Sequence, residues 1–128
     1  MVTKLVSQEF PKSSRVRKQA DFDAVYRDSV HAADDVLVVQ AVSNGQEKTR
    51  LGLSIGRKVG NAVVRNRWKR AIREVFRKSV QQFPVGIDIV VRPRKDAELS
   101  YAAIERSMPR LVARIAKKLG MKTKAQQE

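Results

Sequence analysis

The 128-residue chain contains no cysteine, and this absence excludes a disulfide framework and any thiolate metal site. It has one histidine, His31, and few aromatic residues. The longest apolar runs, such as Val36 to Val39, have the length of a strand and are too short to cross a bilayer. The N-terminus has no apolar segment of the kind that a secretory signal needs. We therefore expect a cytoplasmic protein without a membrane partner.

Positive charge is abundant and unevenly distributed. Lys and Arg number 27 against 13 Asp and Glu, which gives a net charge of +14. Residues 48–95 hold 14 basic and two acidic residues, so this segment carries +12 of that charge. A potential of this size attracts polyanions; nucleic acid is the usual partner of such a protein, and an anionic membrane surface is the minor alternative. The charge pattern predicts a nucleic-acid-binding protein.

Hydrophobic periodicity predicts one domain with helices and strands in alternation. The predicted elements are a helix from Gln19 to about Ser29, strands at Val36–Val42 and Leu51–Ile55, a helix over 62–82, a strand at Ile87–Val91, and a helix from the Ser100 cap to about Leu119. The turn residues Ser43-Asn44-Gly45 predict that the first two strands pair antiparallel. Pro109 predicts a kink or break in the last helix. This order predicts an α+β fold, a single-domain α/β sandwich with a small mixed sheet packed by three helices.

The helix over 62–82 is amphipathic, with Asn61 as its predicted N-cap. Its apolar face is formed by Val64, Trp68, Ala71, Ile72, Val75 and Phe76. Between positions 65 and 78 stand seven basic residues and one acid, Glu74. Like charges at helical spacing repel, whereas phosphates would neutralise them, and the arginine fork suits bidentate phosphate contacts. The predicted RNA-binding residues are Arg57, Lys58, Asn61, Arg65, Asn66, Arg67, Lys69, Arg70, Arg73 and Arg77.

A family resemblance lies in the same helix. The run Gly60-Asn-Ala-Val-Val-Arg-Asn-Arg-Trp-Lys-Arg70 closely resembles the signature of the ribonuclease P protein family, with Arg65-Asn66-Arg67 as its Arg-Asn-Arg core. Leu53-Ser-Ile-Gly-Arg-Lys58 and the first-helix pattern Arg15-x-x-Lys18-x-x-Asp-Phe-x-x-Val-Tyr26 are also similar to that family. The resemblance covers residues 15–119 as the family domain. It leaves an irregular N-terminal arm, 1–14, and a frayed basic and polar tail, 120–128.

The resemblance implies a fold and a role. The fold is an α/β sandwich whose β-α-β crossover is left-handed, where the general rule predicts a right-handed one. The role is that of the RNA-binding protein subunit of ribonuclease P, the ribonucleoprotein endonuclease that removes the 5′ leader from precursor tRNA. Catalysis would then belong to the RNA subunit and its Mg²⁺. We therefore expect no catalytic residue, metal site or tightly bound cofactor in the protein, no required protein partner, and no activity of the protein alone.

The resemblance also implies two surfaces. The basic helix, with Arg57 and Lys58, would contact the catalytic RNA subunit. A cleft between the first helix and the sheet would hold the single-stranded leader, with base stacking worth about 1–3 kcal/mol per base. The predicted cleft residues are Arg15, Lys18, Phe22, Tyr26, Arg65 and Asn66. The alternative for Phe22 and Tyr26 is that both pack in the core. Many family members have a third aromatic on the next strand, where this chain has the aliphatic run Val36 to Val39. We therefore expect less base stacking in this cleft.

Three other functions stay open on the sequence. A ribosomal or nucleoid-type binding protein would show the same charge but not the Arg-Asn-Arg helix after a strand and loop. A helix-turn-helix DNA binder is disfavoured because the basic helix follows a strand. A free-standing nuclease lacks an acid–base or metal cluster: His31 is expected at the surface, and Asp34 and Asp35, as neighbours on a strand, would point in opposite directions.

Overall fold

The computed structural model describes residues 14–120. Its elements are α2 (Gln19–Asp28), β1 (Val30–Ala33), β2 (Leu37–Ser43), β3 (Arg50–Leu53), η2 (Arg57–Val59), α3 (Ala62–Ser79), η3 (Val80–Gln82), β4 (Ile87–Pro93) and α4 (Tyr101–Lys118). Apart from Ser14 and Gly120, the predicted arm and the predicted tail lie outside the described residues. None of the helices between residues 14 and 120 combines the length and the apolarity that a membrane crossing requires.

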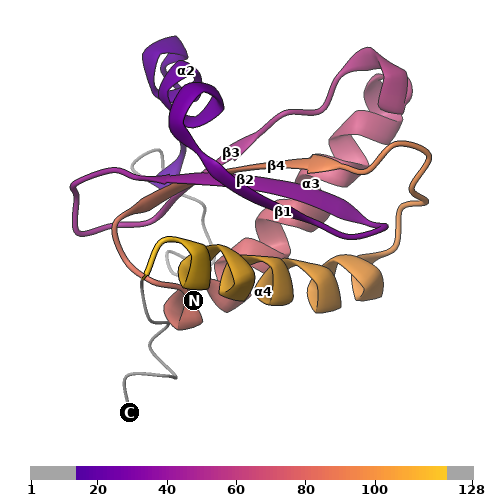
Figure 1. The fold of residues 1–128 in the computed structure, drawn as a ribbon. Helices are drawn as coiled ribbons and strands as arrows, with labels where there is room; N and C mark the ends of the chain where they lie inside the picture. Colours follow the sequence, from indigo (N-terminus) through magenta and orange to yellow (C-terminus); the bar gives the residue numbers. More distant parts are fainter. Residues whose placement is uncertain (1–13, 121–128) are drawn as a thin grey trace, which may run out of the picture.

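The strands form one mixed sheet in the order β1-β2-β4-β3, as Figure 1 shows. β1 with β2 and β2 with β4 are antiparallel, whereas β3 and β4 are parallel. The predicted mixed sheet with three helices is confirmed. The predicted antiparallel pairing of the strands at 36–42 and 51–55 is wrong, because β4 lies between them. β4 is mostly apolar and almost entirely buried, and such a strand is stabilised most in a central position.

β1 was not expected from the sequence, because its short segment VHAA is poor in strand-forming side chains. It is joined to β2 by a turn that Asp34 organises. The Asp34 Oδ1 accepts hydrogen bonds from the backbone N–H groups of Val36 (2.8 Å) and Leu37 (3.0 Å), and its Oδ2 accepts one from the Ser107 hydroxyl on α4 (2.6 Å). Asp34 therefore ties the turn to α4. Among residues 14–120, no three His, Cys, Asp or Glu side chains are grouped as a metal would need.

The two faces of the sheet are packed differently (Figure 1). α4 covers the face below the sheet in that view and packs against α3, while α2 lies on the opposite face. Strand residues alternate accordingly: Leu37, Val39, Ile87, Ile89 and Val91 belong to the main core with both long helices. On the α2 face, Val16, Val25, Val38 and Val90 are buried outside that cluster. The large core is thus on the α3–α4 side, which leaves α2 on a thinner layer.

The helices largely agree with the sequence pattern. The Asn61 side chain accepts a hydrogen bond from Val64 N (3.0 Å) and caps α3, as predicted. The apolar face of α3 is buried at Trp68, Ile72, Val75 and Phe76. α4 is continuous through Pro109, so the predicted break is absent. Proline removes one backbone hydrogen bond, and Glu105, whose carbonyl would have accepted it, is an exposed residue where water can take its place.

Candidate nucleic-acid interface

A pocket with several cationic side chains lies at the β3 edge of the sheet, between α2 and α3. The extended segment before α2 runs beside β3. Arg15 forms an isolated parallel β-bridge with Leu51, and Val16 N donates a hydrogen bond to Leu51 O (2.9 Å). This pairing brings residues far apart in the sequence into one cavity of about 220 Å³. Its lining consists of Arg15, Val16, Arg17, Phe22, Leu51, Leu53, Lys69 and Arg73. We call it the cationic pocket.

Arg73 gives the cationic pocket its chemical character. Its Nε is buried and has no hydrogen-bond partner among residues 14–120. Burial lowers the pKa of the Arg73 guanidinium, and the positive charge of Arg15 lowers it further. Two guanidinium groups therefore lie near each other with a lysine beside them, an arrangement that an anion would stabilise.

The apolar side of the cationic pocket includes the Phe22 ring. Phe22 is half-buried, and the Tyr26 ring lies next to it with centroids 6.2 Å apart at 37°. Tyr26 does not line the cationic pocket and is 46% exposed, so the alternative that it packs in the core is wrong. Phe22 has one side against the sheet and another toward the pocket.

A charged network attaches α2 to the sheet beside the cationic pocket. Arg50 on β3 donates from Nε and Nη2 to the two carboxylate oxygens of Asp88 on β4, at 2.8 and 2.5 Å. Its Nη2 also lies 3.4 Å from Asp21 on α2. The hydrogen bond to Asp88 raises the pKa of the Arg50 guanidinium. Asp88 is buried, and Asn44 Nδ2 donates to it as well (2.8 Å). The network sets the position of the helix that carries Phe22.

The predicted leader-cleft residues are only partly brought together. Arg15 and Phe22 line the cationic pocket, whereas Lys18, Tyr26, Arg65 and Asn66 do not. The structure adds Lys69 and Arg73 from the predicted RNA-binding set. It also adds Arg17, Leu51 and Leu53, which the sequence reasoning missed. The spacing of Arg15 and Arg17 was a usable signal, because residues two apart on an extended segment point to the same side.

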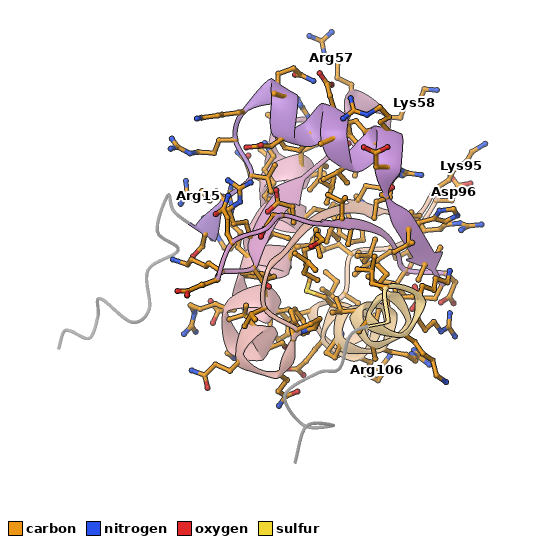
Figure 2. The ribbon with its side chains drawn as sticks, turned by 60° about the vertical axis from the view of Figure 1, so that its left-hand side comes forward. Arg15, Arg57, Lys58, Lys95, Asp96 and Arg106 are labelled. Atoms are coloured by element: carbon orange, nitrogen blue, oxygen red, sulfur yellow. The ribbon has the colours of Figure 1, made fainter. Side chains whose placement is uncertain are left out.

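The other predicted RNA-binding residues differ in how free their side chains are. Arg57, Lys58, Asn66, Arg67 and Arg70 are exposed, and Figure 2 shows Arg57 and Lys58 projecting outward, away from Arg15. Asn61 is used as the cap of α3. Arg65 Nε donates to Gly60 O (3.2 Å), and Arg77 forms hydrogen bonds and an ion pair with Glu74. The first five residues are therefore the better surface for phosphates. Asn61, Arg65 and Arg77 also stabilise the fold.

The residues of α3 present basic groups on two sides of the helix. Lys69 and Arg73, four apart, share the side that faces the cationic pocket. Arg67, Arg70 and Glu74 share the other side, where they line a second cavity with Leu99 and Tyr101. The tertiary structure therefore divides the RNA-binding set predicted from the sequence between two surfaces.

The chain is similar to known proteins over most of its length. Residues 10–116 match the family model described as Ribonuclease P. The ribonuclease P protein component of Brevibacillus brevis is 39% identical over 105 residues, covering 80% of this chain and 83% of the relative. That of Thermotoga petrophila is 35% identical over 100 residues, covering 78% and 86%. The solved structure of the Staphylococcus aureus RNase P protein superposes with a TM-score of 0.71 at 38% identity, covering 83% of this chain and 97% of that one. The chain therefore belongs to the ribonuclease P protein family, the protein component of the ribonucleoprotein endonuclease that matures the 5′ end of tRNA.

Proposed function

We propose that the cationic pocket holds the single-stranded 5′ leader of precursor tRNA. The observation that carries this proposal is the convergence of Arg15, Lys69 and Arg73 with the Phe22 ring in one cavity. Cationic side chains next to an aromatic ring suit a single strand, because they accept the phosphates while a base stacks on the ring. Tyr26, exposed beside Phe22, extends the stacking surface outward.

The exposed basic residues of α3 and the η2 turn bind the catalytic RNA subunit in this proposal. Arg57, Lys58, Asn66, Arg67 and Arg70 are available for phosphates, and arginine favours bidentate contacts. The RNA subunit and its Mg²⁺ supply the hydrolysis, and the protein supplies binding energy for the substrate, in the cytoplasm where tRNA is processed. The alternative of a ribosomal or nucleoid-type protein is not favoured, because the family match covers most of the chain.

The test is Phe22→Ala, read as the ratio of affinities of the assembled ribonucleoprotein for precursor and mature tRNA. These ligands differ in the leader, so the ratio isolates its contacts. Loss of one stacked base should lower the ratio by about five- to 150-fold. The matched control is Phe76→Ala, because Phe76 is 2% exposed in the main core. That variant should lose stability, by about 3–5 kcal/mol, without changing the ratio. An unchanged ratio in a folded Phe22→Ala protein would refute leader binding in the cationic pocket.

A further inference from the structure

A second cavity, of about 440 Å³, lies on the side of α3 away from the cationic pocket. It is lined by Arg67, Arg70, Ala71, Glu74, Leu99 and Tyr101. We call it the Tyr101 pocket. Leu99 and Tyr101 are 38% and 36% exposed, although large apolar side chains are stabilised by leaving water. The other large exposed aliphatic residues between 14 and 120, Val63 and Val85, line neither the cationic pocket nor the Tyr101 pocket.

Tyr101 stands at the capped start of α4, and a lysine of α3 lies over its ring. Tyr101 is the first residue of α4, directly after Ser100, whose hydroxyl oxygen accepts a hydrogen bond from Ala103 N (3.2 Å). The Lys78 ammonium lies 5.5 Å from the centroid of the ring, and Lys78 does not line the Tyr101 pocket. The cap thus fixes the backbone of Tyr101, and a fixed backbone lowers the entropic cost of binding a flat partner.

The walls of the Tyr101 pocket suit a negatively charged ligand with an apolar part. Arg67 and Arg70 are exposed, and neither is in a described ion pair. The one acidic residue of the lining, Glu74, is neutralised by Arg77 and by Lys78, whose Nζ lies 3.9 Å away. This pairing reduces the repulsion between Glu74 and a phosphate. An aromatic ring flanked by two free guanidinium groups matches a nucleotide, whose base stacks while its phosphates pair with arginine.

We propose that the Tyr101 pocket receives an unpaired nucleobase of the catalytic RNA subunit. This inference rests on the proposed function, because it takes the RNA subunit as the ligand of the exposed side of α3. Arg67 and Arg70 bind the phosphates on either side of that base, and Tyr101 and Leu99 contact its faces. The protein then has two base-binding sites on opposite sides of α3, the cationic pocket for the leader and the Tyr101 pocket for the RNA subunit.

The test measures the affinity of Tyr101→Ala and Tyr101→Phe proteins for the cognate catalytic RNA subunit. Loss of the ring should weaken binding by about five- to 150-fold, whereas phenylalanine keeps the stacking face and should bind like the parent. The control is Val85→Ala, an exposed apolar side chain outside the Tyr101 pocket, which should bind normally. Melting temperatures of all variants establish that they are folded.

A second measurement reports contact directly. Trp68 is the only tryptophan and is 2% exposed. A Tyr101→Trp variant therefore has one buried tryptophan and one exposed tryptophan, and the exposed one reports on binding. Its fluorescence should be quenched when the RNA subunit is added, as expected for a stacked base. Val85→Trp is the matched variant and should not be quenched.

Both results are required for the proposal to stand. Parent-like affinity of Tyr101→Ala, or absence of quenching in Tyr101→Trp, overturns it and leaves the Tyr101 pocket for a partner other than RNA. A change in the ratio of precursor to mature tRNA affinity also overturns it, because the pocket would then hold the leader. A failure of the proposed leader binding gives a different result. The ratio of precursor to mature tRNA affinity is then unchanged in Phe22→Ala, while Tyr101→Ala still weakens binding of the RNA subunit.

Discussion

Phe22 lies against the backbone of Gly52, so close that a β-carbon at position 52 would be 3.0 Å from Cε1 of the ring. The same β-carbon would be 3.0 Å from Cβ of Val16. Position 52 is buried in β3, and the absence of a side chain there lets α2 and the preceding segment approach the sheet. The shape of the cationic pocket thus depends on a glycine that carries no charge or ring of its own.

Gly52→Ala should therefore move Phe22 and reduce discrimination for the leader. Overpacking of this kind costs about 1–3 kcal/mol of stability. We expect a lower melting temperature together with a smaller ratio of precursor to mature tRNA affinity. Gly56→Ala is the control for stability, because an added β-carbon there meets no atom within 4 Å. A Gly52→Ala protein with the parent ratio would show that Phe22 can shift without loss of the leader contact.

The salt dependence of RNA-subunit binding should separate free from paired arginines. Each lost phosphate contact reduces the log–log slope by up to about one. Arg70→Ala should show this reduction, because Arg70 is exposed and in no described ion pair. Arg77→Ala should show less, since Arg77 is already paired with Glu74. Titrations at several salt concentrations measure both slopes, and equal slopes for the two variants would contradict the assignment.

Arg50→Met should strongly destabilise the fold. Arg50 and Asp88 are 15% and 4% exposed at their side chains, so removal of the guanidinium leaves a carboxylate buried without its main partner. Such a loss costs about 3–5 kcal/mol. Asp21→Asn removes only the longer contact at the edge of the network and should cost under about 1 kcal/mol. Denaturant unfolding measures the free energy of unfolding of both variants. Similar decreases in the two would show that an unpaired Asp88 carboxylate is not the cause of the destabilisation.

Stability should fall at acidic pH partly through Asp34. Burial by itself would raise the pKa of Asp34, but hydrogen bonds from Ser107, Leu37 and Val36, with the charge of Arg110, lower it below its ordinary value of 3.8. A carboxyl whose pKa is lower in the folded state stabilises the fold above its unfolded pKa, and this contribution is lost as the pH falls through the folded value.

Asp34→Asn should therefore unfold with a weaker dependence on pH below about 4 than the parent. Asparagine keeps an oxygen that can accept the backbone hydrogen bonds of the turn, so the variant tests the charge more than the turn. Urea unfolding at pH values between neutral and acidic gives the two curves. If the free energy of unfolding depends on pH in the same way in both proteins, Asp34 is not a source of the acid sensitivity.

The protein alone should not cleave precursor tRNA, and its addition to the cognate RNA subunit should restore cleavage at low Mg²⁺. The reason is the proposed division of roles, in which the protein contributes binding energy for the substrate and the RNA subunit with its metal carries out the hydrolysis. Gel assays of 5′ leader release with RNA alone, protein alone and both measure this. Robust cleavage by protein free of RNA and contaminating nuclease would contradict the division of roles.

Local patterns in the sequence were sufficient for most of the elements and for the nature of the partner. The amphipathic period of α3, the Asn61 and Ser100 caps and the excess of positive charge are consequences of neighbouring residues, so they can be interpreted without a structure. The Arg-Asn-Arg run indicated the family for the same reason.

The tertiary structure alone decided which strands are neighbours and which basic residues share a surface. β4 enters between β2 and β3 because burial on both faces outweighs the local turn at Ser43–Gly45, and this pairing energy depends on segments more than 30 residues apart. The division of α3 into two basic sides follows from what packs beside it: the segment of Arg15 and Phe22 on one side, and Leu99 with Tyr101 on the other. A helical period states which residues share a face, but the contacts that make a face a binding site come from chain segments whose positions are set by the burial of the core.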